Sequence, residues 1–327
     1  MAPHVAVAHY PEGAGHATRM LAVARSLEAH GATVAVAGGG PGAEFVDLHG
    51  YDGYEPATVD YIDDFQDGGN LLRVLTNSVP ISAKRVLDYV GWLRREDPTA
   101  LVTDDMFAAM AATLTGTPLH VLTHNAPGYY DERVEEWFTW LLTEYQLAAG
   151  SQFLYPAVWE SAPEDPGGIT RIPPVALEAP PADAPVAADG GDPPADPGVV
   201  LVPSHYSRGS DDLAERLRAE GHRVTLVGDD DWETVPALLP VLRRADAVVC
   251  SGYSTVMEAA VAGTPCVVYP FTDEQEGVAR VLDREGVPGF AVVDDADGVA
   301  TALSDPPEAV PRDNGADAAA KRILAAH

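Results

Sequence analysis

Residues 245–286 decide the fold and read ADAVVCSGYSTVMEAAVAGTPCVVYPFTDEQEGVARVLDREG. An apolar run that ends at Val249 predicts a strand, and Ser254 begins a helical pattern that Gly263 ends. A second apolar run at 266–269 predicts the next strand, before a loop. The stretch therefore predicts a βαβ unit of a parallel sheet.

The turn before this helix suits a phosphate group. A helix N-terminus at the carboxyl end of a parallel strand presents unpaired N–H groups and the positive end of the helix dipole. Gly252 leaves room for a close approach, and Ser254 and Thr255 add hydroxyl groups. An alternative stays open, because Thr255 and Glu258 have the spacing of a capping box, which would only stabilise the helix start.

The N-terminal half begins with a second βαβ pattern. Residues 4–8 and 33–37 are predicted strands, and residues 17–30 are a predicted helix. The loop after the first strand carries a glycine and histidine motif, made of Gly13, Gly15 and His16. Its glycine spacing differs from the dinucleotide fingerprint, so the motif does not support NAD binding.

Polar side chains end two further predicted strands of this half. Asp104 and Asp105 follow the strand at 100–103, and Asp105 could instead cap the next helix. His124 and Asn125 follow the strand that ends at residue 123. Because the carboxyl ends of parallel strands share one sheet edge, we expect these groups to face a common cleft.

The order of these motifs resembles the GT-B glycosyltransferases of the MurG and UDP-glycosyltransferase type. The donor half of those enzymes shares the order Ser-Gly-x-Ser-Thr-x-x-Glu-Ala, Ala-Gly-Thr-Pro and Asp-Glu-Gln-Glu. PEGAGHATR, at residues 11–19, resembles their opening Gly-x-Gly-His segment, including an archaeal MurG-like subgroup with Gly-His-Ala-Thr-Arg. The resemblance implies an α/β fold of two Rossmann-like doubly wound domains facing across a cleft. It also implies transfer of a sugar from a nucleotide-diphosphate donor, most commonly a UDP-sugar, to an acceptor hydroxyl with inversion.

The resemblance also implies roles for single residues. His16 would take the acceptor proton or bind near the donor phosphates, and Asp104 would hold its imidazole. The expected acceptor-side residues are Gly13, Gly15, His124 and Asn125. The expected donor-side residues are Ser204 or Arg208, with Gly252, Ser254 and Thr255, at the diphosphate, Glu258 at the ribose, and Glu274 and Gln275 at the hexose. The nucleotide base would lie near residues 228–232.

Two positions depart from the resembled pattern. Val278 stands where these enzymes commonly carry an asparagine, and Pro11 and Glu12 stand where many carry glycines. Either change would be expected in a subgroup with a different acceptor.

Composition limits the partners. The chain has 50 acidic and 20 basic residues, a formal charge of −30, and its only lysines are Lys84 and Lys321. Such a surface repels nucleic acids and anionic lipid headgroups. Acidity of this degree with little lysine is typical of proteins from a cytoplasm with molar salt, where the Debye length is about 3 Å. We therefore expect a halophilic archaeal member.

Cysteine usage and hydropathy complete this picture. Cys250 and Cys266 lie in or beside predicted strands and are expected to be reduced core residues. No His/Cys cluster with ligand spacing is present, so neither a catalytic metal nor a cofactor besides the donor is expected. No apolar run approaches the roughly 20 residues that span a bilayer, which predicts a cytoplasmic protein with at most peripheral membrane contact.

We expect an N-terminal acceptor domain at 1–160, a Pro-, Ala- and Asp-rich linker at 161–197 and a C-terminal nucleotide-sugar domain at 198–327. Within the linker, residues 170–175 are expected to enter the second domain as a short strand. By the resemblance, a terminal helix at 317–326 crosses back to the first domain.

Two helical patterns in the first half are less regular. Residues 71–95 predict two helices broken at Pro80. A helix from Glu132 carries an apolar stripe of Val134, Trp137, Phe138, Leu141, Leu142 and Tyr145, which predicts a core face. The alternative is an apolar wall for a lipid-linked or other hydrophobic acceptor.

Two other functions remain open at this stage. A UDP-sugar 2-epimerase-like enzyme has the same fold but needs acid and base carboxylates in the cleft, for which Asp104 and Asp105 are candidates. A non-catalytic nucleotide-sugar-binding subunit is the other.

Overall fold

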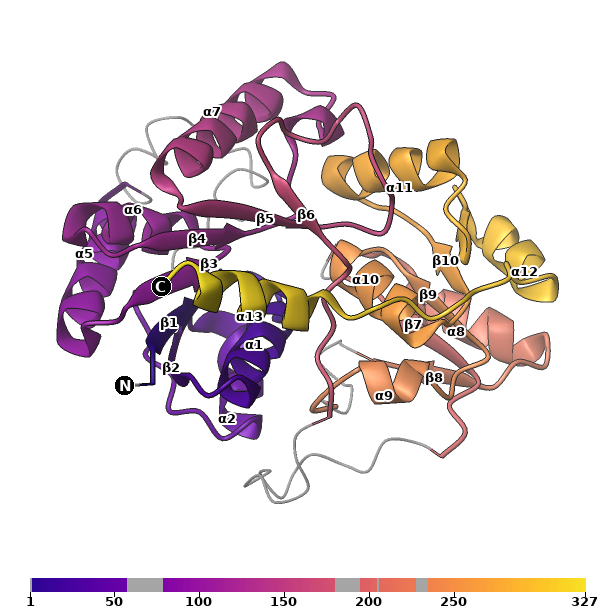
Figure 1. The fold of residues 1–327 in the computed structure, drawn as a ribbon. Coiled ribbons are helices and arrows are strands. Elements are labelled where there is room, and N and C mark those ends of the chain that lie inside the picture. The colour runs from indigo at the N-terminus through magenta and orange to yellow at the C-terminus, as the bar shows by residue number, and fades with distance from the viewer. Residues whose placement is uncertain (1, 58–78, 180–194, 205, 228–234) are drawn as a thin grey trace.

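The computed structural model contains two parallel sheets, each covered by helices (Figure 1). The structure describes residues 2–57, 79–179, 195–204, 206–227 and 235–327. Two Rossmann-like α/β halves were predicted, and this fold class is confirmed.

The first sheet has six strands in the order β2-β1-β3-β4-β5-β6. Their bounds are β1 His4–Ala8, β2 Thr33–Ala37, β3 Ala100–Thr103, β4 Leu119–Leu122, β5 Gln152–Pro156 and β6 Thr170–Ile172. The helices of this half are α1 Ala14–Ala29, α2 Ala43–Leu48, α5 Val79–Glu96, α6 Met106–Thr115 and α7 Arg133–Ala149, with the 3-10 turns η1 Gly40–Gly42 and η3 Pro127–Tyr129. Strands β3 and β4 are buried along their whole length, as expected for a parallel sheet covered on both faces.

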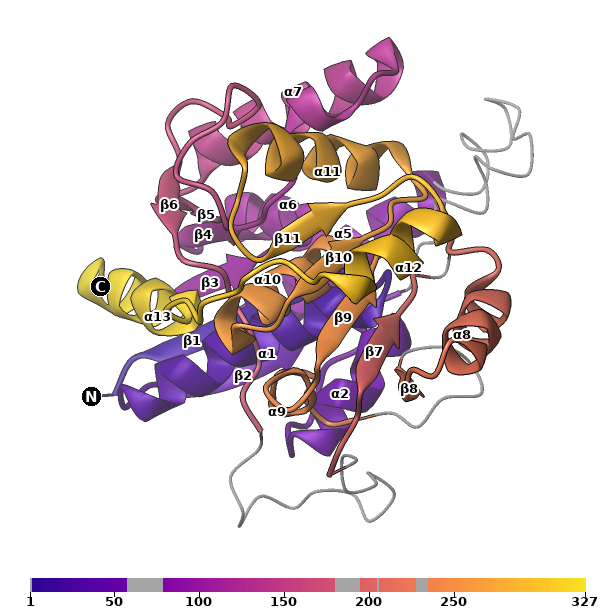
Figure 2. The ribbon, with the colours of Figure 1, turned by 90° about the vertical axis from the view of Figure 1, so that its right-hand side faces the viewer.

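The second sheet has five strands in the order β11-β10-β9-β7-β8. Their bounds are β7 Val199–Val202, β8 Val224–Leu226, β9 Ala247–Cys250, β10 Cys266–Val268 and β11 Phe290–Val292. The helices are α8 Ser210–Ala219, α9 Leu239–Leu242, α10 Tyr253–Ala262, α11 Asp273–Glu285, α12 Ala296–Ser304 and α13 Gly315–Ala325. Figures 1 and 2 both place α13 beside α1, so the end of the chain packs on the first half.

The structure corrects two predicted helix starts near the motifs. Helix α1 begins at Ala14, so His16 lies in a helical turn rather than in the preceding loop. The loop predicted after the strand at 266–269 was expected to carry Glu274 and Gln275 at its tip, but it ends before them. They lie in the first turn of α11, because the side chain of Thr272 caps that helix by accepting from the backbone N–H of Gln275.

Longer-range packing corrects two more predictions. The segment 170–175 does not enter the second half; its strand β6 pairs with β5 of the first sheet. Helix α5 begins at Val79, next to the break predicted at Pro80, and residues 71–78, which were to form the first of the two helices, lie outside the described ranges. Four residues of the predicted apolar stripe of α7 are exposed rather than in the core, namely Val134, Trp137, Phe138 and Leu141, whereas Leu142 and Tyr145 are half-buried. The helix turns Thr139, Thr143 and Gln146 inward.

The prediction that both cysteines are reduced core residues agrees with the structure. Cys250 and Cys266 are buried free thiols with their Sγ atoms 3.6 Å apart. Among the described residues, no helix is long and apolar enough to cross a membrane.

Helix α11 joins the two halves. Arg280 donates to the carbonyl of Tyr129 at 3.0 Å, and Arg284 makes two 2.7 Å bonds to Glu164. Val278, the apolar residue at the position where an asparagine is common, is 2% exposed and belongs to this packing. Gly277 allows the contact, because a Cβ atom there would lie 2.5 Å from the backbone of Tyr129.

We expect Gly277→Ala to lower the free energy of unfolding by about 1–3 kcal/mol, since backbone atoms must move to admit the methyl group. Gly91→Ala, in α5, is the matched control: no atom lies within 4 Å of its added Cβ. There the substitution should raise stability by about 0.5–1 kcal/mol through helix propensity. Denaturant unfolding measures both, and a Gly277→Ala protein as stable as the control would contradict the close packing.

Candidate functional site

His16 and Asp104 come together beside the carboxyl ends of the neighbouring strands β1 and β3. The Nδ1 atom of His16 lies 2.8 Å from Oδ2 of Asp104, and Oδ1 of Asp104 accepts from the backbone N–H of Tyr10 at 2.8 Å. The Asp104 side chain is fully buried, whereas that of His16 is 31% exposed. The carboxyl group of the pair is thus held inside the protein, whereas the imidazole ring is accessible to a ligand.

The buried carboxyl group is an anion. Burial alone would raise its pKa, but the charges of and hydrogen bonds from His16 and Arg19 hold the pKa of Asp104 well below its usual range. A carboxylate oxygen 2.8 Å from Nδ1 requires the proton of a neutral His16 ring to lie on Nδ1. The Nε2 atom of His16 then has a free lone pair and can accept a proton.

Arg19 is a site residue that the sequence interpretation missed. Its side chain is buried, one helical turn after His16, and it bonds Oδ2 of Asp104 at 2.5 Å. It also lies 3.1 Å from Nδ1 of His16, but the carboxylate is the better acceptor for its protons. The signal was present in the quoted Gly-His-Ala-Thr-Arg motif, because positions i and i+3 share a helix face.

The same guanidinium group extends the polar chain to the second half. Arg19 donates to Nδ1 of His124 at 3.0 Å, so the His124 proton lies on Nε2, which donates to Glu274 at 3.0 Å. Burial lowers the pKa of His124, which keeps it neutral. His124 and Glu274, predicted on opposite sides of the cleft, are therefore in direct contact. Asn125 instead accepts from the Tyr130 hydroxyl at 3.2 Å.

The two helix starts that carry the motifs face each other. A Cβ atom on Gly15 would lie 2.4 Å from Oγ of Ser254, so the approach of α1 and α10 requires glycine there. Gly13 precedes α1 with a φ of 75°, a conformation that glycine adopts without strain. His16 therefore lies close to the N-terminus of α10.

Glu258 is not part of a capping box. Helix α10 begins after Gly252, which has no side chain to cap it, and Thr255 already lies inside the helix. Glu258 is 5% exposed, no hydrogen bond reaches its carboxyl group from the described residues, and burial raises its pKa to about 8. An isolated buried acid of this kind is suited to a ligand that brings its own hydroxyl groups.

Ser204 and Gln275 meet near the end of β9. Gln275 donates to Oγ of Ser204 at 3.3 Å, and the Ser204 backbone N–H donates to Oγ of Ser251 at 3.1 Å. Arg208 is exposed and lines a narrow pocket with Ser251. These residues, which come from the loops after β7 and β9 and from the first turn of α11, thus lie at the carboxyl edge of the second sheet.

Asp105 does not face the cleft. Its carboxylate accepts from Arg85 at 2.7 Å, from the Tyr89 hydroxyl at 2.8 Å and from the backbone N–H of Phe107 at 2.8 Å. Asp105 therefore caps α6, which is the alternative that its sequence position had left open.

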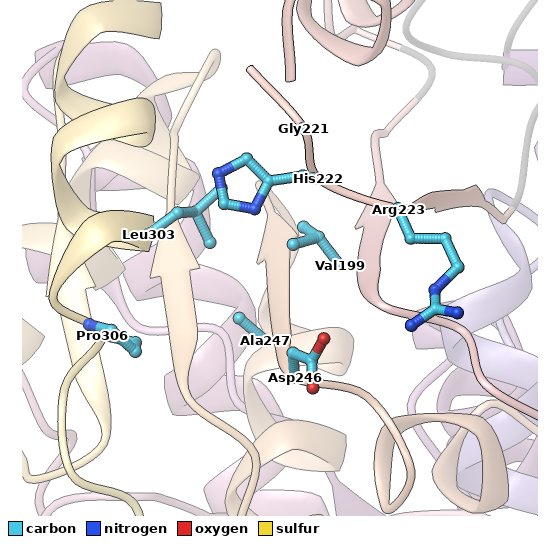
Figure 3. Close-up of a pocket in the computed structure, with 8 residues that line it drawn as sticks. All are labelled: Val199, Gly221, His222, Arg223, Asp246, Ala247, Leu303 and Pro306. Atoms are coloured by element: carbon cyan, nitrogen blue, oxygen red, sulfur yellow. The ribbon is translucent and has the colours of Figure 1, made fainter. Parts of the chain in front are cut away.

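A larger cavity of about 530 Å³ lies at the opposite edge of the second sheet (Figure 3). Its lining includes Val199 and Ala247, the first residues of β7 and β9. Ligands of such sheets bind at the carboxyl ends of strands, so this cavity is not the predicted donor site.

Comparison with protein-family models and with curated proteins found no match. Solved structures are similar over almost the whole chain. The Spinosyn Forosaminyltransferase SpnP has a TM-score of 0.63 at 18% identity, covering 100% of this chain and 95% of that one. The Streptomyces sp. SF2575 glycosyltransferase SsfS6, complexed with thymidine diphosphate, has a TM-score of 0.64 at 16% identity, covering 99% and 100%. The glycosyltransferase SnogD from Streptomyces nogalater has a TM-score of 0.62 at 18% identity, covering both chains fully. The chain therefore has the GT-B fold.

Proposed function

We propose that this protein is a glycosyltransferase that moves a sugar from a nucleotide-diphosphate donor to an acceptor hydroxyl, with inversion and without a metal. The observation that carries the proposal is the His16–Asp104 pair on a helix that approaches the N-terminus of α10, where a Cβ atom on Gly15 would lie 2.4 Å from Oγ of Ser254. A base on one side of a cleft and a phosphate-binding helix end on the other are the two groups that such a transfer needs.

In the proposed step, Nε2 of His16 takes the proton of the acceptor hydroxyl as its oxygen attacks the anomeric carbon. The bond from that carbon to the diphosphate oxygen breaks, and the electron pair leaves with the nucleoside diphosphate. N–H groups after Gly252 and the hydroxyls of Ser254 and Thr255 stabilise that charge. Asp104 stabilises the imidazolium that forms on His16.

The remaining contacts to the donor are assigned from where each residue lies relative to the N-terminus of α10. Glu258 would accept from the ribose hydroxyls, Glu274 and Gln275 would bind the hexose, and Ser204 and Arg208 would contact the diphosphate. We propose a UDP-sugar as the donor, from the MurG-like resemblance. One similar structure holds thymidine diphosphate, so dTDP-sugars form the second arm of a donor screen. The loop expected at the base, 228–232, lies outside the described residues.

The acceptor and the setting are also proposals. We infer a small-molecule or lipid-linked acceptor, and a salt-rich cytoplasm as the setting, from the charge of −30. One similar structure, Spinosyn Rhamnosyltransferase SpnG, is complexed with an aglycone, which supports a small-molecule acceptor. Assays therefore belong in molar KCl as well as in dilute buffer.

We expect His16→Ala to lower turnover about 100- to 10,000-fold, because the general base is lost, while UDP binds within threefold of the parent affinity. Product formation and calorimetric titration measure the two quantities. His30→Ala is the matched control, since His30 ends the same helix and only contacts Asp317 at the surface. Unchanged turnover in the His16 variant would contradict the assigned base.

The same assay separates the alternatives. An epimerase would convert the donor without an acceptor, and a binding subunit would show no turnover with any acceptor. The burial of Asp105 in the α6 cap disfavours the epimerase, because only one of its two candidate carboxylates remains near the cleft.

Glu258→Gln should change how stability depends on pH. The pKa of Glu258 in the folded protein, about 8, exceeds its ordinary value of 4.5, so its stabilising effect is complete below pH 4.5 and is lost as pH rises to 8. The variant should therefore gain about 2–4 kcal/mol relative to the parent between pH 5 and pH 9, as measured by denaturant unfolding.

Glu215→Gln, on the exposed surface of α8, is the control for this titration. The Glu258 variant should also bind UDP up to about tenfold more weakly, because the amide nitrogen of Gln cannot accept a hydrogen bond from a ribose hydroxyl as a carboxyl oxygen can. Parallel stability curves for parent and variant would show that Glu258 is not the buried acid described above.

A further inference from the structure

Helix α7 presents its apolar side to solvent. Its buried positions are the polar residues Thr139, Thr143 and Gln146. Its exposed positions include Val134 at 73%, Trp137 at 60%, Phe138 at 53%, Trp140 at 48% and Leu141 at 46% exposure. Contiguous apolar surface of this kind on a soluble protein marks an interaction site.

The orientation of α7 is fixed by its C-terminal half. The hydroxyl of Tyr145 lies 2.8 Å from Oγ1 of Thr113 and 3.2 Å from the carbonyl of Ala109, both on α6. Figure 1 shows α7 as the outermost helix over the end of the first sheet, beyond α6. Its exposed stripe therefore cannot turn inward without breaking the contact with α6.

The charges around the stripe disfavour a membrane. Exposed glutamates surround it at Glu132, Glu135, Glu136 and Glu144, and Arg133 is the only basic residue of the helix. Helices that lie on membranes carry Lys and Arg along their polar side, which anionic headgroups attract. A chain of charge −30 lacks that attraction.

The two ends of the apolar stripe carry opposite charges. Arg133 lies at its N-terminal end and Glu144 lies 11 residues later, about three turns along the same side of the helix. Neither residue has an ion-pair partner within the described ranges. In an antiparallel pair of α7 helices centred between Phe138 and Thr139, Arg133 would face the partner subunit's Glu144 at both ends.

We propose that α7 is the interface of a homodimer, in which two copies pair antiparallel about a two-fold axis. The axis makes the interface isologous, which means that both subunits contribute the same surface. The apolar stripe of one subunit, made of Trp137, Phe138, Trp140 and Leu141, would pack against the same stripe of the other. Aromatic residues of this type dominate the centre of protein interfaces, with charged pairs at the rim. The inference is independent of the proposed transfer reaction.

The test is sedimentation equilibrium of the full chain at 0.2 M and 2 M KCl. Trp137→Asp should raise the dimer dissociation constant at least 100-fold, whereas Val310→Asp, an exposed apolar residue outside α7, should leave it unchanged. Circular dichroism confirms that each variant is folded. A parent that stays monomeric at 100 μM in both salts, or a Trp137→Asp protein that dimerises like the parent, overturns the proposal.

A charge exchange tests the antiparallel geometry. Arg133→Glu and Glu144→Arg should each weaken the dimer about tenfold at 0.2 M KCl, since each places two like-charged pairs in the interface. The double variant should recover the parent constant within about threefold. A double variant weaker than both single ones overturns the pairing, and flotation of a monomeric parent with phosphatidylcholine vesicles would assign the stripe to a lipid surface instead.

Discussion

The candidate site depends on one buried anion, the carboxylate of Asp104. A charged carboxyl group without water is strongly unfavourable unless it is paired and hydrogen-bonded. Here the Tyr10 N–H, the Arg19 guanidinium and the His16 ring supply those partners. Because Arg19 also bonds His124, which bonds Glu274, the orientation of groups on both sheets follows from this single charge.

The polar chain can connect the two halves only because they approach each other closely. Two glycines allow this, since Gly15 lies against Ser254 and Gly277 lies against Tyr129. Between them the Tyr253 hydroxyl donates to the carbonyl of Pro156 at 3.1 Å, and its ring lies 4.5 Å from that of His124. Close contacts of this kind fix the distance between the two halves more firmly than long side chains do.

The sequence predicted the features that depend on residues close together along the chain. Strands and their polar ends follow from apolar runs, whereas the pairing of Asp104 with His16 was implied by the resemblance to GT-B glycosyltransferases. Periodicity also identified the two sides of α7, but not which side faces inward, because that depends on the contact of Tyr145 with α6. Likewise β6 has three residues, too few to reveal that its partner is β5 of the first sheet.

The burial of Asp104 and Arg19 explains how a chain with a charge of −30 can still hold a polar site in a defined geometry. Exposed ion pairs such as Lys84 with Asp88 are screened by salt and contribute little. The bonds of Asp104 and Arg19 lie away from solvent, where salt screens them much less. The geometry of the site therefore depends little on ionic strength. Salt acts instead on encounters between molecules, because it screens the repulsion between acidic chains.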